Sequence, residues 1–167
     1  MEKVLVAKSE KLFNNIIKGS LMLLEFDDLV EKAKEDLEIN HDNLIDVSAR
    51  TGIDMVFYAE QRSRWNQQKS KREAELDKVY RYLWLYYTGK ANASCLEYLK
   101  KKTPFKIQLN NKQDIEKFIE SDTLYQESRT LVQDAENAIK FLDEVIGAIR
   151  FRTQVVRNII QEKTNLG

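Results

Sequence analysis

Apolar residues recur at helical spacing through the middle of the chain. From Asp42 to Thr88 the sequence has neither a proline nor a cluster of turn residues, and seam positions alternate at spacings of four and three. One continuous helix of this length would extend about 70 Å, although the polar centre from Arg62 to Arg72 is also compatible with a break. Gly89 suits the C′ position that ends such a helix. The expected seam positions are Leu44, Ser48, Thr51, Met55, Tyr58, Arg62, Trp65, Lys69, Arg72, Leu76, Val79, Leu83 and Tyr86.

A second long helix is predicted from about Asp122 to Glu162, with a more regular apolar seam. A further apolar face accompanies the seam in the later half of this helix. A helix that is apolar on more than one face needs more than one partner, and in so short a chain other subunits are the natural source. The seam consists of Leu124, Ser128, Leu131, Ala135, Ala138, Leu142, Val145, Ile149, Arg152, Val156 and Ile159. The further face consists of Ile139, Phe141, Ile146, Phe151, Val155 and Ile160.

The first part of the chain carries a weaker pattern. Residues 1–20 form an N-terminal extension in which a short strand or a frayed helix could begin near Val4. Leu21 to Glu38 has the spacing of an acidic amphipathic helix. Asn40 or Asp42 then supplies an N-cap for the long helix that follows.

Shorter elements connect the two long helices. Ala93 to Lys102 predicts a short helix that Pro104 stops, because proline cannot continue a helix. The residues from Phe105 to Leu109 alternate like a brief strand, and Lys112 to Glu120 predicts another short helix. The pattern therefore predicts an all-α, mostly helical chain with at most one minor strand.

Composition supports one helical domain. The chain of 167 residues has five glycines and one proline, fewer than an all-β fold would need for its turns. Within it we distinguish an extension (1–20), a region with the acidic and the long basic helix (21–110) and a C-terminal helical region (111–167). The single cysteine, Cys95, excludes an internal disulfide and fits a reducing compartment. We see neither a signal peptide nor a membrane span, and expect no membrane contact.

The net charge of zero hides a strong segregation of charge along the chain. Residues 20–60 hold eleven acids and three bases, whereas residues 62–106 hold four acids and twelve bases. The acidic stretch could be a solvated face, a docking surface for a basic protein or a partner for the basic stretch of a neighbouring subunit. The basic stretch points to an anionic ligand.

Aromatic residues accompany the cations of the basic stretch, among them Trp65, Tyr82, Trp84, Tyr87 and Phe105. Cations attract a phosphate backbone and flat rings stack on unpaired bases, which together favour binding of single-stranded nucleic acid. Alternatively, the rings are core and the cations are solvated, or the rings face inward while the cations bind the backbone from outside. The candidate binding residues are Arg62, Arg64, Trp65, Lys69, Lys71, Arg72, Lys78, Arg81, Lys90, Lys100, Lys101 and Lys102.

Signs of enzymatic chemistry are lacking. His41 is the only histidine, and we interpret it as a surface or capping residue because general base catalysis needs a positioned partner. One histidine and one cysteine do not make a zinc site of the usual ligand count. The glycines lack the spacing of a phosphate-binding loop. We therefore predict a binding protein without a cofactor, metal or catalytic residue.

One motif near the end of the long helix resembles a known family. The run from Arg81 to Lys90 contains Tyr-Tyr-Thr-Gly-Lys and is similar to the basic-aromatic stretch of the UvsY family, the recombination mediators of T-even-like phages. The similarity extends over about residues 24–161. It includes an acidic stretch near Phe26, Trp65 with the residues that follow it, and a C-terminal helix that contains Leu142, Asp143, Ala148, Ile149 and Arg152.

This resemblance implies a function and several partners. Members of the family bind single-stranded DNA, form ring-like homo-oligomers through their C-terminal helices and help a RecA-like phage recombinase displace single-strand-binding protein. They are not ATPases. We accordingly expect a hexamer or heptamer in the cytoplasm of the host cell. The residues expected at the subunit interface are Leu131, Leu142, Val145, Ile149, Val156 and Ile159.

The chain departs from the family motif at one position. Two basic residues of that motif contribute to DNA binding; the first matches Arg81, but the second matches Leu83, which is apolar. This departure shifts the expected contacts to Arg81, Lys90 and the cations upstream. The alternative hypothesis is a scaffolding helical homo-oligomer without a DNA role, in which basic and acidic stretches of neighbouring subunits pair.

Overall fold

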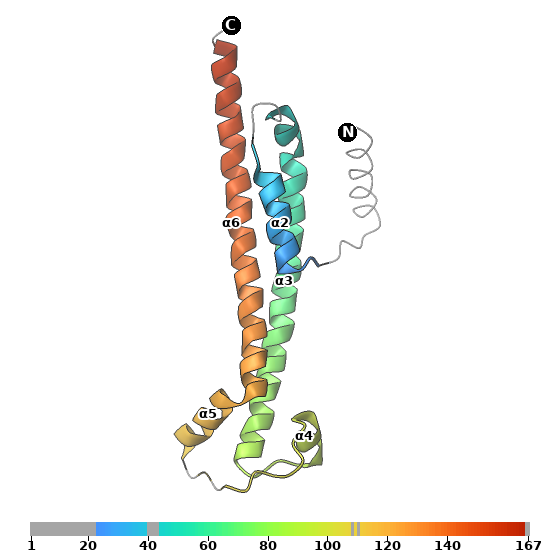
Figure 1. Ribbon diagram of the computed structural model, residues 1–167, viewed down its shortest axis with the longest axis vertical. Coiled ribbons are helices and arrows are strands. Elements are labelled where there is room, and N and C mark those ends of the chain that lie inside the picture. The colour runs from blue at the N-terminus through green and yellow to red at the C-terminus, as the bar shows by residue number, and fades with distance from the viewer. Residues whose placement is uncertain (1–22, 40–43, 108, 110, 166–167) are drawn as a thin grey trace. The chain divides into compact units, whose positions relative to one another are not determined.

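The computed structural model describes residues 23–39, 44–107, 109 and 111–165 (Figure 1). It divides the chain into two compact units, Met1–Glu38 and Ile39–Gly167. The expectations for the N-terminal extension, for the N-caps Asn40 and Asp42, and for His41 fall outside the described residues. No helix in the described ranges is long and apolar enough to span a membrane.

The first unit contributes helix α2, which covers Phe26–Leu37. The helix begins five residues after the predicted start at Leu21. Asp27 and Asp28 occupy its first turn, where the partial positive charge of a helix N-terminus stabilises carboxylates. Leu29 and Ala33, one turn apart, are buried, so the predicted amphipathic pattern is present.

Two helices of similar length dominate the second unit. Helix α3 covers Leu44–Tyr87 and helix α6 covers Thr123–Asn165. The polar centre of α3 contains no break. It has neither glycine nor proline, and ion pairs between residues four apart, such as Arg64 with Glu60, support the helix there.

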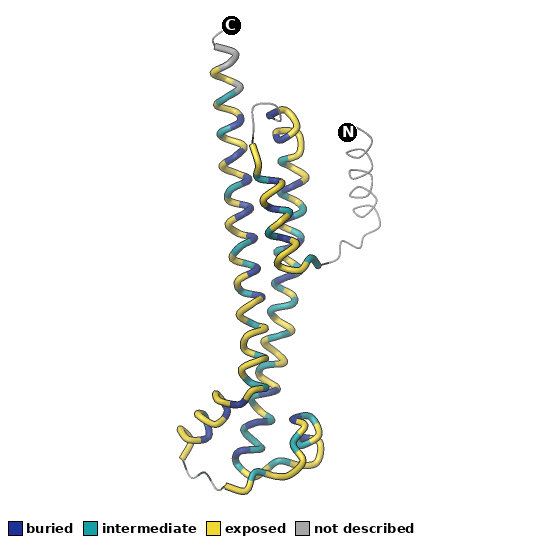
Figure 2. Tube along the Cα trace, in the orientation of Figure 1, coloured by how far each residue is buried: buried dark blue, intermediate teal, exposed yellow. Residues whose placement is uncertain are grey.

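α3 and α6 pack side by side in antiparallel directions (Figure 1). Asp54, near the start of α3, contacts Arg152, whereas Lys69, further along α3, contacts Glu136. Residue numbers on α6 thus fall as those on α3 rise. Buried positions recur along both helices (Figure 2), so the pair forms the predicted seam within a single chain.

The seam of α6 follows the prediction from Ala135 to Val156, although the predicted seam position Leu131 is exposed; that of α3 follows it in part and is displaced by one residue elsewhere. On α6 the buried seam positions are Ala135, Ala138, Leu142, Val145, Ile149, Arg152 and Val156. On α3 the predicted positions Leu44, Tyr58, Trp65, Val79 and Leu83 are buried. Elsewhere the buried residues are Val47, Asp54, Gln61 and Tyr87, in place of the predicted neighbours Ser48, Met55, Arg62 and Tyr86. The prediction was wrong at these four positions. At Met55 it followed the apolar side chain, whereas the fold buries the neighbouring Asp54 against a cation of α6.

Two short helices lie where α3 ends and α6 begins (Figure 1). Helix α4 covers Ala93–Tyr98 and helix α5 covers Lys112–Ser121. α4 ends before the predicted boundary at Lys102, with Lys100 in a left-handed conformation (φ 53°). Proline therefore does not stop this helix. The residues predicted as a strand, 105–107 and 109 among those described, form no strand, since an isolated short strand has no edge to pair with.

Candidate nucleic-acid interface

The Tyr-Tyr-Thr-Gly-Lys motif forms the C-terminal cap of α3. The amide of Lys90 donates to the carbonyl of Leu85 at 2.8 Å, and the amide of Gly89 donates to that of Tyr86 at 3.1 Å. This is a Schellman motif, which requires a left-handed residue at C′. Gly89 fills that position with φ 71°, as the sequence predicted. The cap turns the chain sharply and leaves Lys90 exposed at the helix end.

The aromatic rings around this cap pack against one another. We call Tyr86, Tyr87, Phe105 and Phe118 the aromatic cluster. Tyr87 meets Phe105 edge to face at 4.9 Å between ring centroids, and Phe105 meets Phe118 at 5.7 Å. Such geometry is favourable for aromatic pairs. These rings, which the sequence predicted to stack on bases, are therefore largely packed against one another. This agrees with the alternative in which the rings face inward.

A buried polar contact ties the aromatic cluster to the start of α6. The hydroxyl of Tyr87 donates to Asp122 Oδ2 at 2.9 Å, and Asp122 Oδ1 accepts from the amide of Leu124 at 3.0 Å. Burial raises the pKa of Tyr87, and its hydrogen bond to the carboxylate raises it further. Lys101 Nζ lies 3.2 Å from the same Oδ2. Lys101, a candidate for DNA binding, is thus paired with a buried carboxylate.

Three cations of α3, the inward cations Arg62, Lys69 and Arg72, face α6. Arg62 Nε donates to Asp143 at 2.5 Å, and this hydrogen bond raises the pKa of Arg62. Lys69 Nζ lies 2.9 Å from Glu136, whose hydrogen bond raises the pKa of Lys69. Arg72 Nη1 donates to a backbone carbonyl of α6 at 2.7 Å. These side chains hold the helix pair together.

A second set of cations, the outward cations Arg64, Lys71, Lys78 and Arg81, does not reach α6. The first three recur every seven residues, so they form nearly one line along α3 with about 10.5 Å between neighbours. Among the described residues, the ion-pair partners of Arg64 and Lys78 are Glu60 and Glu75, both on α3 itself. Exposed pairs of this kind contribute about 0–1 kcal/mol, so a phosphate can replace the carboxylate at small cost.

Arg81 and Lys71 are the least engaged of the outward cations. Arg81 is exposed, and in the part of the chain that the structure describes its Nε donates only to the carbonyl of Asp77, 3.3 Å away on the same helix. Lys71 is exposed and has no ion-pair partner within the described ranges. Both therefore present a full positive charge to solvent.

Lysines surround the end of α3 as well. Lys90, Lys100, Lys102 and Lys106 are exposed, and none has an ion-pair partner among the residues that the structure describes. Lys106 lies within the predicted basic stretch but is not among the candidate binding residues. The adjacent Phe105, which the fold places in the aromatic cluster, is the feature of the sequence that could have identified it.

Trp65 does not lie on this surface. Its side chain is only 4% exposed and sits in the seam between α3 and α6. The guanidinium of Arg72 lies over its ring, 5.5 Å from the centroid. The indole Nε1–H has no hydrogen-bond acceptor in the described part of the chain. The structure thus separates Trp65 from the outward cations with which the sequence grouped it.

The residues expected at a subunit interface are divided by the fold. Leu142, Val145, Ile149 and Val156 are at most 3% exposed within the single chain, where they line the seam. Leu131 is 49% exposed and Ile159 is half-buried. Of the further apolar face, Phe151 is 70% exposed. The apolar surface that α6 leaves uncovered is therefore smaller than its sequence suggests.

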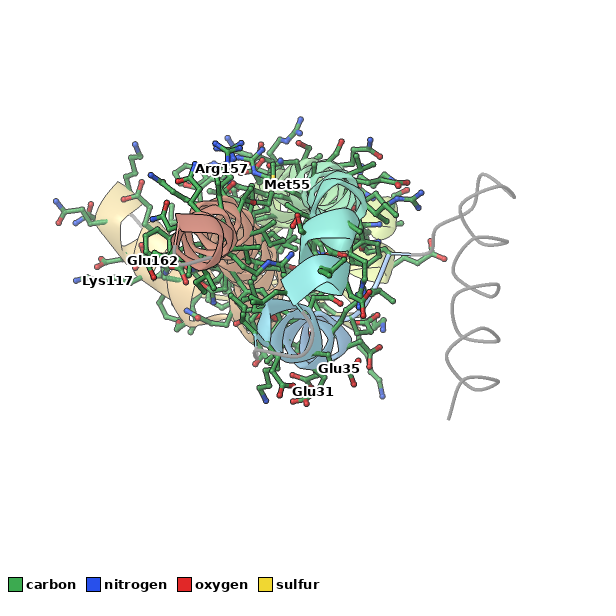
Figure 3. All side chains as sticks on the ribbon, turned by 90° about the horizontal axis from the view of Figure 1, so that it is seen from above. Glu31, Glu35, Met55, Lys117, Arg157 and Glu162 are labelled. Carbon is green, nitrogen blue, oxygen red and sulfur yellow. The ribbon has the colours of Figure 1, made fainter. Side chains whose placement is uncertain are left out.

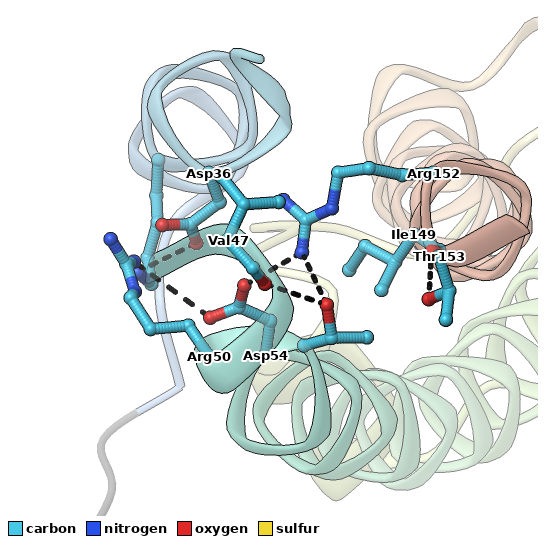
Figure 4. A network of polar contacts seen from close by, with 9 residues as sticks. Asp36, Val47, Arg50, Asp54, Ile149, Arg152 and Thr153 are labelled. Atoms are coloured by element: carbon cyan, nitrogen blue, oxygen red, sulfur yellow. Dashed lines mark hydrogen bonds and ion pairs between the residues drawn. The ribbon is translucent and has the colours of Figure 1, made fainter. Parts of the chain in front are cut away.

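A buried ion pair lies in the seam of the long helices. Arg152 Nη2 reaches from α6 to Asp54 Oδ2 at 3.0 Å and to the hydroxyl of Thr51 at 3.4 Å (Figure 4). The two charged side chains are 3% and 7% exposed. Arg50 adds a second, longer contact to Asp54 at 3.8 Å. Because a buried charge without a partner is costly, this pair favours one register of α3 against α6.

Acidic side chains do not assemble into a metal site in the described ranges, where no group of three or more potential ligands lies together.

The thiol of Cys95 is buried and donates to the carbonyl of Tyr82 at 3.3 Å. Burial raises the pKa of Cys95, which disfavours its reactive thiolate. The outward cations and the exposed lysines at the end of α3, by contrast, are suited to binding an anionic polymer.

Comparison with known proteins gives a consistent result. Residues 32–165 match the family model described as "Recombination, repair and ssDNA binding protein UvsY". The chain is similar in fold to the crystal structure of the bacteriophage T4 recombination mediator protein UvsY. In one lattice the TM-score is 0.73 at 17% identity, over 86% of this chain and 99% of that chain. In another lattice it is 0.73 at 16% identity, over 84% and 98%. Among curated protein sequences no significant match is found.

Proposed function

The chain belongs to the UvsY family of recombination, repair and single-stranded DNA-binding proteins, and from this premise we propose that it is a recombination mediator. Single-stranded DNA would follow the outward cations of α3 to the lysines at the helix end. An extended single strand exposes both phosphates and bases. A row of cations that leads to the aromatic cluster can bind both of these groups. The protein acts by binding and carries no catalytic residue in this proposal.

The division of the basic residues is the observation that carries the proposal. The inward cations are used in contacts with α6, whereas Lys71, Lys90, Lys100 and Lys102 have no ion-pair partner within the described residues. If the basic stretch only stabilised the fold, several exposed cations in one segment would not add to that stability, because like charges repel. Their accumulation at one end of α3 is best explained by an anionic ligand.

The position at which the chain departs from the family motif is consistent with this division. Leu83 is 0% exposed and packs in a small core with Val79, Cys95 and Ile119. A cation could not replace Leu83 without being buried unpaired. The neighbouring Arg81 is exposed, so we assign the contact of this motif to Arg81 and supplement it with Lys90.

We further propose that the chain assembles into a homo-oligomer, a hexamer or heptamer, that loads a RecA-like phage recombinase in place of single-strand-binding protein. The exposed Phe151 on α6 and Leu131 support a contact between subunits, because large apolar side chains at 70% and 49% exposure favour burial. The four seam residues already covered by α3 would contribute indirectly, by keeping α6 straight and in register.

The proposed function is tested by the salt dependence of binding. Arg81→Ala with Lys90→Ala should weaken binding to a labelled oligothymidine and make the slope of log K against log salt shallower by about 1.4, since each phosphate contact to a single strand contributes about 0.7. Fluorescence anisotropy at several salt concentrations measures both quantities.

Arg157→Ala is the matched control. Arg157 is exposed on α6 and projects away from the helix pair (Figure 3), so this variant should bind as the parent does. If the double variant and the parent share one slope, the assigned surface is wrong. If the parent does not bind the oligonucleotide, the scaffolding alternative takes the place of this function.

A further inference from the structure

A small cavity lies where α3 ends beside the loop that follows α4. Its volume is about 310 Å³. This lies at the lower end of the roughly 300–1,000 Å³ spanned by small-molecule sites, so the space suits one flat ring system better than a folded peptide. It is lined by Tyr87, Thr88, Gly89, Phe105, Lys106, Ile107 and Leu109.

We propose that this space, the α3-end cavity, holds one unstacked nucleobase of the bound single strand. The proposal rests on the proposed function. It adds a base-binding subsite to the outward cations, which would bind the phosphates. All seven lining residues lie within the second unit of the chain.

Ring geometry at the cavity supports a flat ligand. Phe105 is half-buried, and the edge-to-face contacts of its ring with Tyr87 (83° between planes) and with Phe118 (66°) fix its orientation. A fixed ring loses little conformational freedom on stacking. Ile107, 60% exposed, adds apolar surface that an inserted base would cover.

Electrostatics assign the base and the phosphates to different parts of the cavity. The C-terminal end of a helix carries partial negative charge, which disfavours phosphate and favours N–H donors. At the end of α3 the carbonyls of Leu85 and Tyr86 accept hydrogen bonds from the cap, while the carbonyl of Tyr87 has no hydrogen-bond partner in the described part of the chain. A base carries N–H groups that can donate to such a carbonyl.

Lysines near the cavity can hold the flanking phosphates. Lys106 is one of the lining residues, and Lys90 follows Gly89 directly. Both are exposed and lack an ion-pair partner among the described residues. Gly89 leaves open space, because a Cβ built there would have no atom within 4 Å. The backbone can therefore be approached closely at this point.

The test compares binding of a labelled oligothymidine with that of an oligonucleotide of equal length and charge that carries abasic sites. The parent protein should prefer the first by about tenfold or more, as stacking and base contacts are lost on the second. Phe105→Leu should bring this ratio towards one. Phe57→Leu is the matched control, because it makes the same substitution on α3 outside both the aromatic cluster and the cavity lining.

A second measurement does not depend on the folding of a variant. An oligonucleotide with 5-iodouridine should cross-link on irradiation to Phe105 or Tyr87 of the parent protein, as mapped by mass spectrometry. Equal binding of the two oligonucleotides by the parent, an unchanged ratio in Phe105→Leu, or cross-links only to residues away from the cavity would overturn the subsite. These outcomes leave the proposed function intact, whereas failure to bind either oligonucleotide removes both.

Discussion

The inward and outward cations of α3 share a helix and a sign but differ in what they contact. Arg62 and Lys69 reach carboxylates of α6 at 2.5 and 2.9 Å, whereas Lys71 and Arg81 find no carboxylate outside their own helix in the described part of the chain. Only one residue separates Lys69 from Lys71. The difference follows from the 100° turn between successive residues of a helix, which sets neighbours in the sequence on different faces.

This comparison shows that the charge of a segment overstates the charge available to a ligand. Part of the basic stretch stabilises the helix pair, and Lys101 is paired with the buried Asp122. Variants of the residues that hold the fold should therefore change stability and leave the salt slope of DNA binding unaltered. Three such variants, taken in order of expected effect, test the distinction.

The largest loss of stability is expected for Asp54→Ala. This substitution leaves Arg152 charged in the seam without its main carboxylate, which costs about 3–5 kcal/mol for a buried pair. Urea unfolding followed by circular dichroism measures the change. The double variant Asp54→Leu with Arg152→Met should recover most of the loss, because apolar residues can replace a buried ion pair. A single variant as stable as the parent would contradict the role assigned to the pair.

A smaller effect, with a distinct pH dependence, is expected for Tyr87→Phe. Loss of the hydrogen bond to Asp122 should cost about 1.5–3 kcal/mol near neutral pH. The pKa of Tyr87 is raised above its ordinary value of 10.0 by burial and by Asp122. Its contribution to stability is therefore complete below pH 10 and is lost as the pH rises towards the raised pKa.

Urea unfolding at about pH 8 and about pH 11 distinguishes this contribution from simple packing. The parent should lose more stability between the two conditions than Tyr87→Phe does. A constant difference between parent and variant would show that ionisation of Tyr87 plays no part. Tyr125→Phe serves as the control, since Tyr125 is half-buried and no hydrogen bond of its hydroxyl occurs in the described structure.

The smallest effect is expected for Arg62→Gln with Lys69→Gln. Both ion pairs with α6 are partly exposed, so water and salt screen them, and the urea midpoint should fall less than for Tyr87→Phe. The difference should shrink further in high salt. The slope of DNA binding should match that of the parent; a slope as shallow as that of the Arg81 and Lys90 double variant would erase the distinction between inward and outward cations.

Much of the helical architecture follows from the sequence pattern, and the failures have physical causes. The absence of proline and of a turn cluster predicted α3, and Gly89 predicted its end. The boundary of α4 was missed because Lys100 adopts a left-handed conformation that glycine would signal more clearly. The seam position of Asp54 was missed because hydrophobicity alone gives no sign that Arg152 lies opposite.

The candidate site was predicted as a segment and not as a surface. The basic stretch contains all the outward cations, and the seam pattern included Lys69 but not Lys71. Both were nevertheless kept as binding candidates, because the sequence did not show that carboxylates of α6 lie opposite the seam. It also grouped Trp65 with the exposed residues, although this ring is 4% exposed. The α3-end cavity depends on the path of the loop through Phe105, which local pattern read as a strand.

The seven-residue recurrence of Arg64, Lys71 and Lys78 also affects how a strand can move. A strand displaced along α3 by one repeat of about 10.5 Å meets the next cation in a similar setting. Binding positions of the strand that differ by one repeat would therefore be close in free energy. On the proposed path, α3 would align the strand without fixing its position, so that the strand could move along the helix in short steps instead of dissociating all at once.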